Sequence, residues 1–298
     1  MPSDRSSHLR GVAIVSLGVL LLSPDALFIQ LMNMTQWTVL FFRGAGTLVG
    51  YLLLMRFVTH TPLRAATWRP RGNGLALALA AAAGNVCFVV SIRHVNAALA
   101  LVIVASAPMF TILLGRTLGH GGVPRRTQVA AATVFATIAA IFLTEPQGGD
   151  MVGVASALGA SVAASTLLVI VRGSGDMDVL PWQAAGSVLV ALAMLPLADF
   201  GSVDGDDLLI AIGFSTLMLP TALLLIVQGP RLLTAPETSL LLLLETIIGP
   251  TWIWIFLGEP PTMQAVLAGI VIVGALATNA VLAQRELASG RAQPVVSP

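Results

Sequence analysis

The stretch LLLLLETIIGPTWIW, residues 240–254, combines features that seldom occur together. It is apolar enough for a membrane-spanning helix, yet it carries Glu245 and the pair Gly249-Pro250 near its centre. A charge at the centre of a membrane helix costs roughly 2.5 to 3.5 kcal/mol on insertion scales, and a proline removes a backbone hydrogen bond. The stretch therefore predicts a helix that faces other protein or a cavity rather than lipid.

The composition of the whole chain indicates an integral membrane protein. Of its 298 residues, 56% are hydrophobic and only 10% are charged, against about 25% charged in soluble domains, and the mean hydropathy is +0.91. All fifteen basic residues are arginine, which excludes a Walker A lysine and a lysine Schiff base. A single cysteine, Cys87, excludes an intramolecular disulfide.

Apolar runs of roughly 20 residues, the length that crosses a bilayer core, recur along the chain. We interpret the first run as a membrane span rather than a signal peptide, because no clear cleavage site follows it. The predicted fold is an all-α integral membrane protein with ten transmembrane helices. The expected spans are 11–32, 36–57, 73–92, 97–117, 127–144, 151–171, 181–199, 207–228, 237–257 and 262–284.

The arginines predict the orientation of these spans. Ten spans place both termini on one side, and thirteen of the fifteen arginines fall in the termini and loops of that side. Only Arg93 falls on the opposite side, and Arg43 lies inside the second span. Because positive charge marks the cytoplasmic side, we expect a multi-pass protein of the cell (inner) membrane with both termini in the cytoplasm.

Two segments, His94 to Gly119 and Leu232 to Glu259, share a layout. Each opens with a small-polar turn, continues as a long apolar helix broken near its centre by proline or glycine, and ends in Leu-Gly. They divide the chain into two five-helix halves, 1–146 and 147–298. An odd number of helices per half gives the halves opposite orientations, and inverted repeats with interrupted helices are typical of secondary transporters.

Several segments in this order and spacing resemble the EamA-type drug/metabolite transporter superfamily, over nearly the whole chain. They are FFRGAG (41–46), NAALALVIVASAPMF (96–110), GDMVGVASALGA (149–160) and the pair APETSLLLLLET (235–246) and LGEPPT (257–262). Two departures concern the first half: residues 23–25 read Ser-Pro-Asp where the family often has tryptophan, and the first repeat ends in Leu118-Gly119-His120 without a glutamate. Within the superfamily the sequence is most similar to YddG-type amino-acid exporters. The resemblance implies a cavity walled by the first, third, fourth, sixth, eighth and ninth helices.

Asp25 and Arg43 lie at equal distances from the turn that joins the first two spans, which is centred near residue 34. On antiparallel helices they therefore reach the same depth, roughly 10 Å from the helix ends at about 1.5 Å per residue. We predict an ion pair between them. A direct role in binding a substrate or a proton is open alongside this structural one.

Glu245 shares a helix face with Thr238, Leu241, Leu242, Gly249 and Trp252. Two interpretations stay open for its carboxyl group. It is a protonated group that hydrogen-bonds a neighbouring helix, or it binds the substrate or titrates during a transport cycle.

Further candidates for the cavity are polar side chains and helix breakers inside spans, each of which has an ordinary alternative as a helix–helix hydrogen bond, a close contact or a kink. They are Asn85, Ser106, Pro108, Ser161, Gly249 and Trp252. The four histidines lie far apart, without the spacing of metal ligands, so we expect no metal and no cofactor.

These observations favour a secondary transporter that exports amino acids, aromatic and other, or similar small polar metabolites by alternating access. We expect a monomer or homodimer in the lipid bilayer, with a small-molecule substrate and no nucleic acid. An intramembrane enzyme is the first alternative, although the chain lacks serine-nucleophile, HExxH and DDxxD motifs. A channel-like facilitator is the second, although channels usually build their symmetry between chains.

Overall fold

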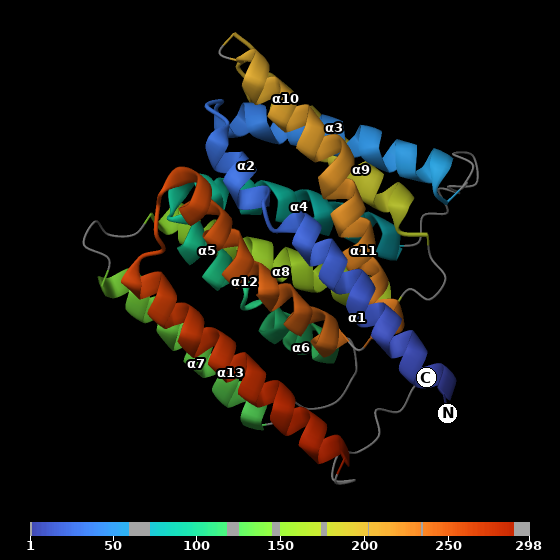
Figure 1. The fold of residues 1–298 in the computed structure, drawn as a ribbon, viewed down its shortest axis with the longest axis vertical. Helices are drawn as coiled ribbons and strands as arrows, with labels where there is room; N and C mark the ends of the chain where they lie inside the picture. Colours follow the sequence, from blue (N-terminus) through green and yellow to red (C-terminus); the bar gives the residue numbers. More distant parts are fainter. Residues whose placement is uncertain are drawn as a thin grey trace.

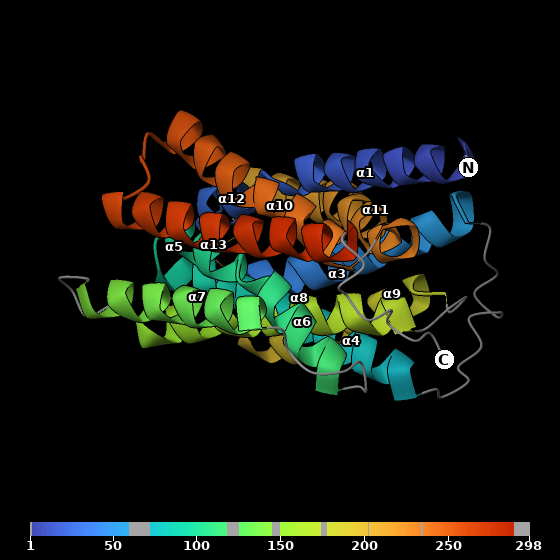
Figure 2. The same ribbon diagram turned by 90° about the horizontal axis from the view of Figure 1, so that it is seen from below.

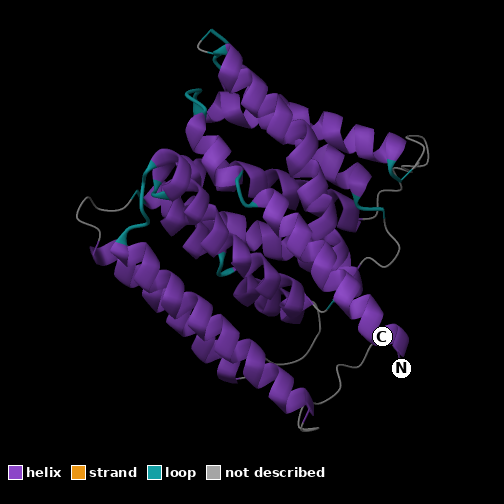
Figure 3. Ribbon diagram, viewed as in Figure 1, coloured by secondary structure: helices purple, strands orange, loops and turns teal. Residues whose placement is uncertain are grey.

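The computed structural model describes residues 2–59, 72–117, 125–144, 150–173, 178–201, 203–233 and 235–288, and every regular element in these ranges is helical (Figures 1 and 3). The expected boundary between the halves, at residues 146 and 147, lies outside the described residues, as do residues 118–120 at the end of the first repeat. The helices are α1 (Pro2–Leu22), α2 (Asp25–Leu31), α3 (Gln36–Phe57), α4 (Gly72–His94), α5 (Ala97–Val104), α6 (Ala107–Thr117), α7 (Arg125–Thr144), α8 (Met151–Gly173), α9 (Leu180–Met194), η1 (Leu195–Leu197), α10 (Gly205–Gly213), η2 (Phe214–Met218), α11 (Leu219–Leu232), α12 (Ala235–Leu257) and α13 (Met263–Ala288).

Each of the ten expected spans is occupied by a helix or by consecutive helices. Among the described residues, seven helical stretches are long and apolar enough to cross a membrane, as in a multi-pass membrane protein. They are Leu9–Leu31, Gln36–Phe57, Asn73–His94, Ala97–Gly115, Met151–Gly173, Leu180–Leu197 and Gly205–Gly229. Shorter apolar stretches lie in α12 and α13. That all ten segments cross the membrane stays a prediction.

The helices lie side by side in one bundle, and their axes are roughly aligned with one another, whichever way the chain runs (Figure 2). We call one end of the bundle the hairpin end, because α2 and α3 meet there through residues 32–35, and α4 and α5 through residues 95–96. The helix α1 begins at the opposite end.

Capping side chains mark the starts of the helices at the hairpin end. Each accepts a hydrogen bond from a backbone N–H in the first turn, where helical partners are missing. The five caps are Thr35 for α3, Asn96 for α5, Asp150 for α8, Asp204 for α10 and Thr262 for α13. The polar turns that bounded the expected spans are therefore also the signals that start the helices.

Two of the membrane-length helices are interrupted by proline. Pro24 separates α1 from α2, and Pro108 lies just after the break between α5 and α6. A proline has no N–H to donate to the carbonyl four residues earlier, which leaves Leu20 and Val104 without that partner. In both places a serine lies at the freed carbonyl: Ser23 Oγ donates to Leu20 O over 2.9 Å, and Ser161 Oγ of α8 lies 2.9 Å from Val104 O.

The predicted break at Gly249-Pro250 is wrong, because α12 continues through Pro250 as one helix. The hydroxyls of two threonines supplement the backbone ladder around this proline. Thr246 donates to the carbonyl of Leu243, and Thr251 donates to that of Ile247 over 2.7 Å. The breaks of the two sequence repeats therefore do not match, although a proline lies near the middle of both.

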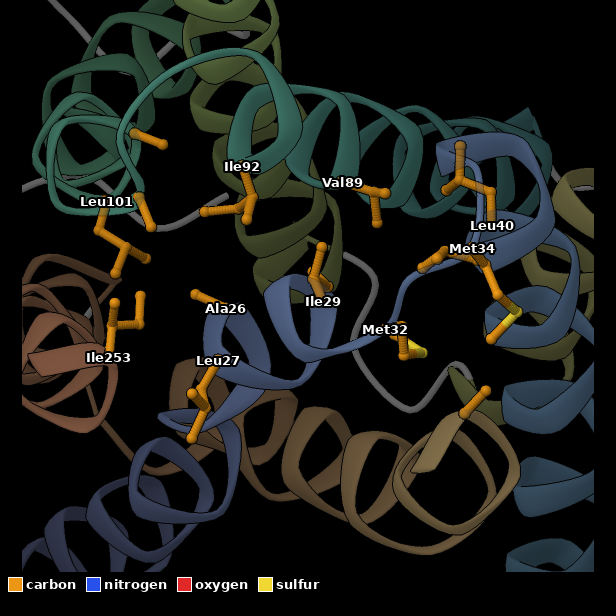
Figure 4. Packing of buried hydrophobic residues seen from close by; sticks show 14 of the residues in the cluster. Ala26, Leu27, Ile29, Met32, Met34, Leu40, Val89, Ile92, Leu101 and Ile253 are labelled. Atoms are coloured by element: carbon orange, nitrogen blue, oxygen red, sulfur yellow. The ribbon is translucent and has the colours of Figure 1, made fainter. Parts of the chain in front are cut away.

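The largest buried hydrophobic cluster lies toward the hairpin end (Figure 4). Its side chains come mainly from α2, α3, α4, α5 and α12, which are far apart in sequence. We call it the hairpin-end cluster. It includes Ala26, Leu27, Ile29, Met32, Met34, Leu40, Val89, Ile92, Leu101 and Ile253.

Candidate functional site: a cavity in the centre of the bundle

A cavity of about 210 Å³ lies between the helices, and both sequence halves line it. Pockets for drug-sized ligands measure about 300 to 1,000 Å³, so this space suits a smaller molecule. Leu101 belongs both to the cavity wall and to the hairpin-end cluster, which therefore adjoins the cavity. The polar and charged side chains in the wall are Asp25, Arg43, Thr47, Tyr51, Asn85, Gln183, Ser187, Glu245 and Thr246.

The predicted ion pair between Asp25 and Arg43 is confirmed. Both side chains are buried, and the guanidinium donates from Nη1 to Asp25 Oδ1 and from Nη2 to Asp25 Oδ2, the latter over 2.6 Å. Its Nε donates to Asn85 Oδ1 over 2.6 Å, and the guanidinium carbon lies 6.0 Å from the centre of the Phe88 ring. This planar, two-pronged arrangement is the geometry for which arginine is suited and lysine is not.

Glu245 of α12 lines the same cavity, on a helix that packs against α2, which carries Asp25. Among the described residues its carboxylate has no hydrogen bond and no ion pair. The sequence left open a bond from Glu245 to a neighbouring helix, and the described residues supply none. The carboxylate instead faces the cavity, next to Thr246, whose hydroxyl is used within its own helix.

Five polar wall residues were not among the sequence candidates: Thr47, Tyr51, Gln183, Ser187 and Thr246. The hydroxyls of Thr47 and Tyr51 are buried and have no hydrogen-bond partner, which is uncommon for polar groups in a folded protein. They follow Arg43 at intervals of four residues, so the three side chains share one face of α3. That spacing from a buried arginine is the signal by which they could have been found.

Of the remaining predicted cavity residues, Asn85 and Pro108 lie in the wall, whereas Ser106 and Ser161 do not. Both serines are fully buried, and their hydroxyl oxygens are 3.0 Å apart. Their hydroxyls contact backbone carbonyls at the interruption between α5 and α6. Ser106 Oγ donates to Ile103 O over 2.7 Å, and Ser161 lies at the freed carbonyl of Val104. In this structure the two serines bond the helix interruption and do not line the cavity.

Gly249 and Trp252 also lie outside the cavity wall. Gly249 permits close packing, because a Cβ atom there would lie 2.7 Å from Cδ1 of Leu101. The indole Nε1 of Trp252 donates to Ser23 Oγ over 3.0 Å. Both residues hold α12 against neighbouring helices rather than line the cavity.

A second ionic contact lies away from the cavity. His94, the last residue of α4, donates from Nδ1 to Asp150 Oδ2 over 2.5 Å. This bond and the backbone N–H groups of Val152 and Gly153 hold the pKa of the Asp150 carboxyl below its ordinary value. Within the described residues no three histidine, cysteine or acidic side chains are grouped so that they could hold a metal ion.

Comparison with known proteins gives a fold but no name for the site. No family model and no curated protein matches the chain. Among solved structures, one described as "Crystal structure of protein" matches with a TM-score of 0.64 at 17% identity, over 93% of this chain and 98% of its own length. At this identity the match shows a shared fold along nearly the whole of both chains and nothing about the site.

Proposed function

We propose that this protein is a secondary transporter, which exports an amino acid or a similar small metabolite across the inner membrane by alternating access. The observation that carries the proposal is the central cavity, in which a buried ion pair and an unpartnered carboxylate face a space bounded by both halves of the chain. Charged groups at membrane depth usually mark a substrate or ion path. The three unpartnered groups, Glu245, Thr47 and Tyr51, are available to a ligand.

The helix packing supports two related halves. In the expected repeat, α1 corresponds to α8, and α4 corresponds to α11. The extensively packed pair of α1 and α11 therefore corresponds to the extensively packed pair of α8 and α4. Likewise, α3 corresponds to α9 and α7 corresponds to α13, and the two members of each of these pairs pack against each other. An inverted repeat predicts this correspondence, and such repeats allow one half to rock against the other around a central site.

The hairpin-end cluster supports alternating access in a second way. It lies toward the hairpin end and adjoins the cavity at Leu101, so we expect exchange through that end to require α2 and its neighbours to separate. A transporter needs such a closed gate on one side at a time, whereas an open channel does not.

The test is transport by the purified full chain in liposomes, with a panel of labelled amino acids and amines. Saturable uptake that is accelerated by unlabelled substrate inside the liposomes is the expected result. Flux that rises linearly with concentration would indicate a channel, and the absence of flux for the whole panel would contradict the proposal. Glu259→Gln, at an exposed site beyond the end of α12, serves as a control variant with the same chemical change as Glu245→Gln.

A further inference from the structure

One acidic side chain in the cavity wall has no partner, and this indicates which ligand the cavity binds. Three charged side chains line it: Asp25, Arg43 and Glu245. The first two neutralise each other in a two-pronged pair. The carboxyl group of Glu245 has no ion-pair or hydrogen-bond partner of its own among the described residues.

Arg43 is already engaged by Asp25 and Asn85 and is poorly placed to bind a second carboxylate. Three of the five N–H donors of an arginine are occupied, one by Asn85 and two by the oxygens of Asp25. A ligand carboxylate would have to displace Asp25 or share the guanidinium with it, which would bring negative charges together in a site of low dielectric constant.

The rest of the wall is neutral and mostly apolar. Phe88, Leu101, Leu223 and Leu242 contribute large apolar side chains to it. The unpartnered hydroxyls of Thr47 and Tyr51 can hydrogen-bond a neutral polar group, but neither carries a charge that would balance a carboxylate.

We propose that the cavity binds a small primary amine with an apolar body, whose ammonium group pairs with Glu245, in preference to the zwitterionic amino acid with the same side chain. The ammonium supplies the partner that Glu245 lacks, the apolar body occupies the neutral wall, and the Asp25–Arg43 pair remains intact. This inference rests on the proposed transport function and narrows its substrate class.

The experiment measures binding to the detergent-purified full chain by isothermal titration calorimetry. Three probes share one phenyl body and differ in charge: phenethylamine, phenylalanine and 3-phenylpropionate. We expect phenethylamine to bind at least tenfold more tightly than phenylalanine, and phenylpropionate not to bind. Glu245→Gln should weaken phenethylamine binding at least tenfold, and Glu259→Gln should leave it unchanged.

Glu245→Asp keeps the charge on a shorter side chain and provides a second variant in case the glutamine variant does not fold. It should bind phenethylamine more weakly than the natural chain and more tightly than Glu245→Gln, with thermal unfolding confirming that each variant is folded. The inference is overturned if phenylalanine binds as well as phenethylamine, if no probe binds, or if Glu245→Gln binds the amine as before. Saturable transport of amino acids in liposomes would then still support the proposed function, so the two failures are distinguishable.

Discussion

The indole of Trp252 donates a hydrogen bond to the hydroxyl of Ser23 over 3.0 Å. Ser23 in turn donates to the carbonyl of Leu20, which Pro24 leaves without its helical partner. One side chain of α12 thus completes the hydrogen bonding at the interruption between α1 and α2. The contact joins the two sequence halves directly beside the cavity residue Asp25.

Replacing Trp252 by phenylalanine should therefore weaken the bundle. The variant keeps an aromatic ring but removes the N–H, and interhelical hydrogen bonds of this kind contribute about 0.6 kcal/mol on average, with a maximum near 1.7. We expect a lower unfolding temperature in detergent micelles. Trp254→Phe is the matched control, because Trp254 is exposed on the same helix and should tolerate the change. Equal losses in the two variants would show that the bond to Ser23 is not the cause.

The free energy of unfolding should fall more when one partner of the Asp25–Arg43 pair loses its charge than when both do. Asp25→Asn removes the carboxylate that pairs with the buried guanidinium, and breaking a buried pair in this way costs roughly 3 to 5 kcal/mol. Asp25→Asn combined with Arg43→Gln removes both charges and should cost less than either single change. Equilibrium unfolding in mixed micelles measures all three free energies. Additive losses in the double variant would contradict the proposed coupling.

The ion pair was predictable from sequence, whereas the roles of the serines and of Trp252 were not. Equal distance from a turn fixes equal depth on antiparallel helices, and this was sufficient for Asp25 and Arg43. Whether a side chain points to the cavity or to a neighbour depends on the rotation of each helix about its axis and on local breaks. At the break before Pro108, Ser106 bonds the carbonyl of Ile103 and Ser161 lies at the freed carbonyl of Val104. The spacing of residues in the sequence does not give the rotation that places them there.

The effect of Gly249-Pro250 on its helix was harder to predict from sequence than the position of Glu245. A proline does not by itself determine whether a helix is interrupted, since α12 continues through Pro250. A carboxylate, by contrast, is costly enough in lipid to require a polar surrounding. Glu245 lines the cavity, whereas Pro250 does not interrupt its helix as the sequence suggested.

Gly50 should not tolerate alanine, because α3 packs closely against the π-helical turn η2. A Cβ atom on Gly50 would lie 2.2 Å from the carbonyl oxygen of Thr216 and 2.4 Å from Cγ of Pro220. Backbone oxygen cannot move aside without shifting the helix, so we expect Gly50→Ala to cost about 1 to 3 kcal/mol. Gly213→Ala is the control, since nothing lies within 4 Å of its added Cβ, and alanine there should be neutral or stabilising. The thermal unfolding temperatures of both variants test this prediction, and equal changes in the two would contradict it.

The contact between His94 and Asp150 predicts a dependence of stability on acidic pH. The pKa of Asp150 is lower in the folded protein than in the unfolded chain, where an aspartate has a pKa of about 3.9. The ionised group therefore stabilises the fold fully above that value, and the contribution disappears as the pH falls through the lowered folded pKa. Asp150→Asn keeps an oxygen that can accept from Val152 N but removes the charge. The unfolding temperature of the natural chain should exceed that of Asp150→Asn at pH 6, and the difference should shrink as the pH is lowered through the titration of Asp150. A difference that stays constant over this range would show that the charge of Asp150 contributes nothing and that the loss is steric.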